Sequence, residues 1–128
     1  MLNSLMKSIT GALTPSFGAS LPTVSVVEAH QRQESGSAIL VDVRGPSEWE
    51  QTGVAKGAHR IQMGTPDFIT RLEALRKREP SKAVDLICRS GNRSGSVQRA
   101  LADMGWKEVY NVSGGTSSWM AAQLPMQR

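Results

Sequence analysis

Two short apolar runs constrain the fold of this chain more than any other feature. Residues 38–43 (AILVDV) and 83–87 (AVDLI) are rich in β-branched and aliphatic side chains. Strands this apolar are typical of a parallel sheet that is buried on both faces. Helical spacing follows each run, so strands alternate with helices. We therefore predict an α/β fold, with a central parallel sheet flanked by helices on both faces.

The helices and turns that connect the sheet have their own signals. Residues 65–67 (TPD) supply a cap and a preset first turn for one helix, and Pro80 closes it. Its predicted buried face comprises Phe68, Ile69, Leu72 and Leu75. A second helix, ended by Gly105, has a predicted inner face of Val97, Ala100, Leu101 and Met104. A last strand over residues 109–112 leads through Gly114 and Gly115 into a terminal helix that contains Trp119.

The length of 128 residues fits one domain, which we place at residues 23–128 after an N-terminal extension at residues 1–22. Apolar residues in the extension have the spacing of an amphipathic helix, namely Leu2, Leu5, Met6, Ile9 and Leu13. Such a helix packs on the domain, frays as a tail, or contacts a partner or a membrane surface. A secretory signal is less favoured, because polar residues interrupt the apolar stretch.

Charge and hydropathy exclude several classes of protein. The net charge of +4, from 15 basic and 11 acidic residues, is too small to indicate a nucleic-acid partner. No apolar run approaches the roughly 20 residues of a membrane-spanning helix, so we expect no transmembrane segment. The single cysteine, Cys88, excludes an intramolecular disulfide, a CxxC redox pair and a cysteine-based zinc cluster.

Cys88 lies between the second predicted strand and a helix, in the segment CRSGNRS. Ligands bind at this carboxyl edge in open α/β sheets. Ser90, Gly91 and Asn92 allow successive backbone N–H groups to point inward, and the helix adds the positive end of its dipole. Beside Arg89 and Arg93, a cysteine here can have its pKa lowered from about 8.5 to roughly 3.5–7.5. We predict that Cys88 is a nucleophile in an anion-binding loop of six residues.

The alternative is that Cys88 is a small apolar side chain at the end of a buried strand, as many free cysteines are. A purely structural cysteine has no need of two arginines, a glycine turn and a helix N-terminus nearby. The surroundings therefore favour reactivity.

Several segments, in order, resemble the rhodanese family of sulfurtransferases from about Thr23 to Pro125. They are LVDVRGPSEWEQTGVAKGAHRI, CRSGNRS and GWKEVYNVSGGTSSWMAAQLP. The resemblance includes Asp42-Val43-Arg44, Glu48-Trp49, Gly53, Gly57-Ala58, the cysteine loop, Gly114-Gly115 and Trp119. One departure is Gly53-Val54-Ala55, where many relatives have Gly-His-Ile. We predict that neither His30 nor His59 is a general base; both are structural or exposed.

The resemblance implies a single-domain enzyme in which Cys88 carries sulfane sulfur as a persulfide. It would take sulfur from a donor such as thiosulfate and give it to cyanide, a small thiol or a thioredoxin-like protein, with ping-pong kinetics. Backbone N–H groups of residues 89–94 (Arg89, Ser90, Gly91, Asn92, Arg93 and Ser94) would surround the persulfide, and the two arginines would face the anionic donor. No metal or organic cofactor is implied. Asp42 and Arg44 match the family's strand-end pair, and we expect an ion pair that supports the active-site edge in preference to direct contact with substrate.

Three alternatives to this enzyme have a similar loop or the same fold. A cysteine phosphatase or arsenate reductase needs five residues between its cysteine and arginine, whereas four separate Cys88 from Arg93. A non-catalytic binding module of the same fold would not need the complete loop. A sulfur relay between two proteins uses the same chemistry, and the sequence does not separate it from a small-molecule enzyme.

The charge of the loop and the lone thiol suggest a donor and a compartment. Two guanidinium groups favour a compact dianion such as thiosulfate over mercaptopyruvate. A thiol that must cycle favours the reducing cytoplasm, while the N-terminal extension leaves a periplasmic or membrane-peripheral location open. The sequence does not specify the oligomeric state.

Overall fold

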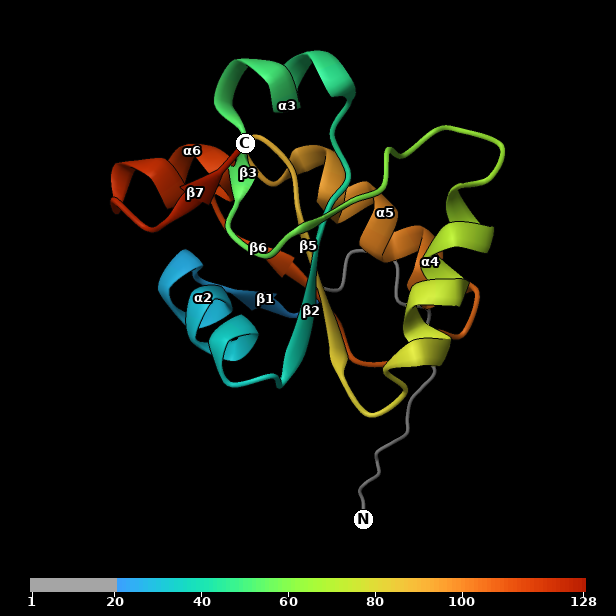
Figure 1. The fold of residues 1–128 in the computed structure, drawn as a ribbon. Coiled ribbons are helices and arrows are strands. Elements are labelled where there is room, and N and C mark those ends of the chain that lie inside the picture. Colours follow the sequence, from blue (N-terminus) through green and yellow to red (C-terminus); the bar gives the residue numbers. More distant parts are fainter. Residues whose placement is uncertain (1–20) are drawn as a thin grey trace.

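The computed structural model describes residues 21–128, which form one sheet between two layers of helices (Figure 1). The five strands of the sheet are all parallel and have the order β1-β6-β5-β2-β4. They comprise β1 (Thr23–Val24), β2 (Ala38–Asp42), β4 (His59–Arg60), β5 (Ala83–Ile87) and β6 (Val109–Val112). A separate antiparallel pair consists of β3 (Val54–Ala55) and β7 (Met126–Gln127). The predicted α/β fold with a central parallel sheet is confirmed.

Helices cover both faces of the sheet, as predicted (Figure 1). The helices are α2 (Val26–Glu34), α3 (Pro46–Thr52), α4 (Phe68–Arg78), α5 (Asn92–Asp103) and α6 (Gly115–Ala121). Helices α4 and α5 lie on one side, α2 and α6 on the other, and α3 lies beyond the carboxyl ends of the strands. Side chains alternate along each strand, so Leu86 joins the core under α4 and α5, while Ile87 joins the core under α2 and α6.

Strand β5 contains one buried acidic residue, Asp85, whose partner comes from α2. Two guanidinium nitrogens of Arg32, Nε and Nη2, each donate to the carboxylate at 2.9 Å. The same guanidinium stacks 4.5 Å above the ring centre of Tyr110. Burial raises the pKa of Asp85, and the hydrogen bonds from Arg32 oppose that rise. The pair fastens α2 to the middle of the sheet.

The structure corrects two details of the predicted helices. Helix α4 begins at Phe68, with Asp67 rather than Thr65 at the N-cap position. The Thr65 hydroxyl lies within hydrogen-bond distance of the Gln62 carbonyl and the Asp67 carboxylate, and it caps no N–H group of the helix. In α5, Val97 and Leu101 are buried as predicted, but Ala100 and Met104 are exposed. Met104 follows the last turn of α5 and is 54% exposed, so the apolar face ends one turn earlier than its spacing indicated.

The predicted N-terminal amphipathic helix lies outside the described residues. Among residues 21–128, none of the helices is both long enough and apolar enough to cross a membrane.

Leu101 in α5 and Met104, directly after its end, give a matched test of this packing. Leu101 is fully buried, so we expect Leu101→Ala to lower the free energy of unfolding by about 2–5 kcal/mol. Met104→Ala, at an exposed site, should change it by about 0.5 kcal/mol or less. Urea denaturation measures both, and equal losses would contradict the assignment of the inner face.

Candidate active site

Cys88 follows β5 directly and is 1% exposed. Its sulfur is surrounded by hydrogen-bond donors from the next six residues. The N–H groups of Gly91 and Ser94 lie 3.1 and 3.4 Å from Sγ, and the Ser94 hydroxyl oxygen lies 3.2 Å from it. Donors converging on one sulfur at the carboxyl edge of a parallel sheet form a cradle for negative charge.

The pKa of the Cys88 thiol is lowered from its ordinary value. Burial raises this pKa, but hydrogen bonds from the Ser94 hydroxyl and from the N–H groups of Ser94, Gly91 and Ser90 more than offset the burial. The low pKa expected from the sequence is therefore present. Its main source is hydrogen bonding from the loop and the first turn of α5, whereas the sequence had pointed to the helix N-terminus together with the two neighbouring arginines.

The loop is shorter than the predicted six residues, because α5 already begins at Asn92. Gly91 precedes the helix with φ at +108°, a conformation that favours glycine, and its N–H donates to the sulfur. Ser94 lies in the first turn, where helix N–H groups have no partner within the helix. One of these N–H groups donates to Sγ, so the helix N-terminus itself forms one wall of the cradle.

The cysteine loop is clamped from behind by the first turn of α6. The N–H and the hydroxyl of Thr116 donate to the Cys88 carbonyl at 2.8 and 3.1 Å, and the Ser117 N–H donates to the Arg89 carbonyl at 3.0 Å. A Cβ atom on Gly115 would collide with both carbonyls. Gly114 and Gly115 make the predicted turn, and Gly115 has a second role that the sequence did not reveal, which is close contact with the active loop.

Asn111, on β6, is a residue of the site that sequence reasoning missed. Its Nδ2 donates to the Gly91 carbonyl at 3.0 Å, and its Oδ1 accepts from the Ser94 hydroxyl at 2.6 Å. The available signal was an amide at the carboxyl end of the strand that neighbours β5. Asn111 connects the glycine turn to the serine that contacts the sulfur.

The two loop arginines have different environments. Arg93 forms a two-pronged ion pair with Glu48 of α3, at 2.7 and 2.8 Å, and this contact lowers the pKa of Glu48. Arg89 is exposed, and within residues 21–128 its side chain forms no hydrogen bond or ion pair. Asn92 is likewise exposed. The positive charge of Arg93 is thus partly neutralised, which the sequence did not indicate.

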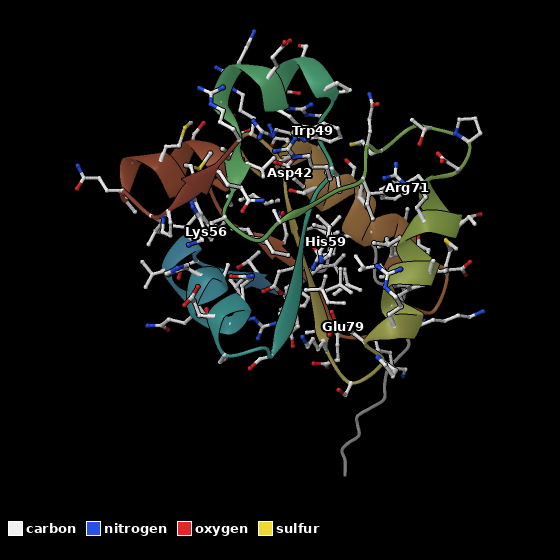
Figure 2. All side chains as sticks on the ribbon, in the orientation of Figure 1. Asp42, Trp49, Lys56, His59, Arg71 and Glu79 are labelled. Carbon is white, nitrogen blue, oxygen red and sulfur yellow. The ribbon has the colours of Figure 1, made fainter. Side chains whose placement is uncertain are left out.

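Asp42 and Arg44 form the expected ion pair, at 2.8 Å, and both side chains are buried. The pair joins the end of β2 to α3, because Asp42 accepts from the Trp49 ring nitrogen and Arg44 donates to the carbonyl of Gly53 and the hydroxyl of Thr52. Figure 2 shows Asp42 and Trp49 together beneath α3. Within the described residues, the hydrogen bonds of this pair go to one another, to α3 and to Gly53 rather than to Cys88.

The histidines are structural or exposed, as predicted, and two tryptophans are buried in the core. His30 packs edge-on against the buried Trp119 with ring centres 5.6 Å apart. His59 is exposed on β4, and its pKa is lowered by partial burial and by Arg78. Trp106 is buried beneath the guanidinium of Arg76. Residues 21–128 contain no cluster of His, Cys, Asp or Glu that could hold a metal ion.

Together the parallel sheet and the cradle define a class of protein: α/β domains with a cysteine at the carboxyl edge of the sheet, surrounded by hydrogen-bond donors. The family model described as Rhodanese-like domain matches residues 25–122, which include every element from α2 to α6. The chain belongs to this family.

Known proteins similar to the chain come from bacteria and from humans. The thiosulfate sulfurtransferase GlpE of Pseudomonas syringae is 33% identical over 72% of this chain and 80% of its own length. A Rhodopseudomonas palustris protein of unknown function, described as a possible tyrosine phosphatase, is 26% identical with a TM-score of 0.68, covering 86% of this chain and 87% of its own. The human single-domain sulfurtransferase has a TM-score of 0.64 and 23% identity, covering 80% and 97%, and shares the fold.

Two serines of α5 test the origin of the low thiol pKa. Ser94→Ala removes a hydroxyl that contacts Sγ and should raise the pKa of Cys88 by about one unit or less. Ser96→Ala removes only an exposed hydroxyl that donates to Asn92 and should leave the pKa unchanged. The pH dependence of Cys88 alkylation measures both, and an unchanged pKa in Ser94→Ala would contradict this origin.

Proposed function

We propose that this protein is a sulfurtransferase that moves sulfane sulfur through a persulfide on Cys88. The observation that carries the proposal is the set of donor groups around one sulfur: the nitrogens of two backbone N–H groups and the oxygen of one hydroxyl lie within 3.4 Å of Sγ. Such donors stabilise an anionic sulfur before and after it accepts a second sulfur atom. The similarity to a thiosulfate sulfurtransferase supports the same chemistry.

The reaction has two balanced half-steps. The Cys88 thiolate attacks the outer sulfur of thiosulfate; a new S–S bond forms, the sulfur–sulfur bond of thiosulfate breaks, and sulfite leaves with the electron pair. The enzyme then holds Cys88–S–S⁻. A thiophilic acceptor such as cyanide attacks the outer sulfur, thiocyanate forms, and Cys88 leaves as a thiolate. Neither half-step needs an external oxidant, a metal or an organic cofactor, and the mechanism is ping-pong.

The residues of the loop have different roles in this reaction. The N–H groups of residues 89–94 hold the persulfide, with those of Gly91 and Ser94 already in place around Sγ. Arg89, exposed and without a protein partner among the described residues, supplies charge for the incoming donor. The guanidinium of Arg93 is bound by the Glu48 carboxylate, so an anionic donor must compete with Glu48 for it. The buried pair of Asp42 and Arg44 supports the edge without touching substrate.

Phosphatase chemistry is not proposed, although one similar structure is described in those terms. A phosphatase loop places an arginine six positions after its cysteine, where its fork binds the oxyanion. In this chain that position is Ser94, whose hydroxyl contacts the cysteine sulfur. The loop is one residue too short to wrap a tetrahedral oxyanion.

Intact-mass spectrometry after brief exposure to thiosulfate tests the proposal. We expect the native protein to gain the mass of one sulfur atom and to lose it when cyanide is added, with thiocyanate formed; Cys88→Ser should gain nothing. A relay that takes sulfur from another protein would gain sulfur only from a persulfide donor. If no donor adds sulfur to Cys88, the domain is a non-catalytic binding module and the proposal is wrong.

A second prediction concerns the donor. Thiosulfate concentrates two negative charges in a small volume, so the exposed guanidinium of Arg89 should favour it over mercaptopyruvate. We expect a larger kcat/KM with thiosulfate, and Arg89→Gln should reduce this preference, whereas the remote exposed Lys107→Gln should not. A larger kcat/KM with mercaptopyruvate would contradict this choice of donor.

A further inference from the structure

The hydroxyl of Ser94 has two neighbours that can accept a hydrogen bond, but it has one proton to give. Its oxygen lies 3.2 Å from the Cys88 sulfur and 2.6 Å from Oδ1 of Asn111. A serine hydroxyl donates a single hydrogen bond, and it can accept others. Only one of the two contacts can therefore receive the proton at any moment, and the contact with Asn111 is the shorter.

The orientation of the Asn111 amide is fixed by a third group, the carbonyl of Gly91. A carbonyl only accepts, so the NH₂ of Asn111 faces it, at 3.0 Å, and Oδ1 faces Ser94. The reversed amide would place two oxygens against each other at Gly91. In the observed orientation Oδ1 can only accept, so the Ser94 proton points to Asn111.

This arrangement suits a neutral thiol better than a thiolate. A thiol S–H can donate to the Ser94 oxygen while Ser94 donates to Asn111, and every group is then satisfied. A thiolate cannot donate and needs donors itself, so the Ser94 proton must turn toward sulfur and leave Oδ1 of Asn111. We propose that Asn111 is a positioning residue that competes with the Cys88 sulfur for the proton of the Ser94 hydroxyl.

The inference rests on the proposed function, because it takes Cys88 as the reacting group. The competition applies whenever Sγ carries the charge, which is before attack on the donor and again when Cys88 leaves as a thiolate. While the persulfide exists, the charge resides on the outer sulfur and the Ser94 proton can return to Asn111. Asn111 thus opposes the anionic form of Sγ selectively.

Charged groups near the loop come from several elements and are left unchanged in the variants below, of which only Asn111→Asp adds a charge. They are the Arg93–Glu48 pair, the buried Asp42–Arg44 pair and the exposed Arg89. The α6 turn that packs behind the loop contributes uncharged Thr116 and Ser117. Differences in the pKa of Cys88 between variants therefore come from the changes made at Asn111 and Ser94.

A double-mutant cycle on the pKa of Cys88 tests the proposal, with Asn111→Ala made in the native protein and in Ser94→Ala. Asn111→Ala also releases the Gly91 carbonyl, but that effect is common to both backgrounds and cancels. In the native background the freed hydroxyl can donate to the sulfur. Asn111→Ala should therefore raise the acid dissociation constant more there than in the Ser94→Ala background, by on the order of three- to tenfold, the worth of one uncharged hydrogen bond.

Ultraviolet absorbance of the thiolate against pH gives the readout, since Cys88 is the only cysteine of the chain. Hydrogen bonding to Glu108 raises the pKa of the single tyrosine, Tyr110, which moves its ionisation away from that of the thiol. Circular dichroism checks that each variant is folded. The titration uses no sulfur donor, so its outcome is independent of whether Cys88 transfers sulfur.

Asn111→Asp, whose side chain has nearly the same shape as that of asparagine, provides a second cycle. A carboxylate holds the Ser94 proton more strongly, so the pKa of Cys88 should rise, and it should rise less in the Ser94→Ala background. The added charge and the lost donation to the Gly91 carbonyl act in both backgrounds and cancel. The two cycles thus predict couplings of opposite sign. Additive effects in both cycles would show that Asn111 only anchors the glycine turn, and would overturn the proposal.

Discussion

Hydrogen bonds to the Cys88 sulfur are the interaction on which the rest of this site depends. The sulfur is almost fully buried, and burial alone would hold the thiol neutral. The Ser94 hydroxyl and the backbone N–H groups of Ser94 and Gly91 reverse that effect only while the loop keeps its shape. The first turn of α6 holds the loop from one side by its carbonyls, and Asn111 holds it from the other by Gly91.

Helix α3 shows how polar contacts extend this support beyond the loop. It has no buried residue of its own, so apolar packing alone does not fix it. The buried Asp42–Arg44 pair ties it to β2, and Glu48 ties it to Arg93 on α5. Removing one partner of a buried ion pair typically costs about 3–5 kcal/mol. The same contacts that position α3 also determine how much of the Arg93 charge faces a donor.

Local signals in the sequence were enough for the sheet and for the chemistry of the loop. The apolar runs predicted β2 and β5 to within one residue, and the glycine turn after Cys88 predicted the cradle. Contacts between residues far apart in the sequence could not be predicted. Asp85 pairs with Arg32 across 53 positions, and Arg93 pairs with Glu48 across 45 positions. Periodicity also placed Met104 inside, because spacing alone does not show where a helix stops facing the core.

The most direct measurement is sulfite release in a single turnover, with the protein mixed with excess thiosulfate and no acceptor. A Cys88 persulfide predicts a burst of about one sulfite per chain that then stops, because the cysteine is occupied. The burst should be absent from Cys88→Ala. In the unsubstituted protein, sulfite release should resume when cyanide is added and removes the outer sulfur. Sulfite that appears only in the presence of the acceptor would contradict the covalent intermediate, since it would require direct transfer from donor to acceptor.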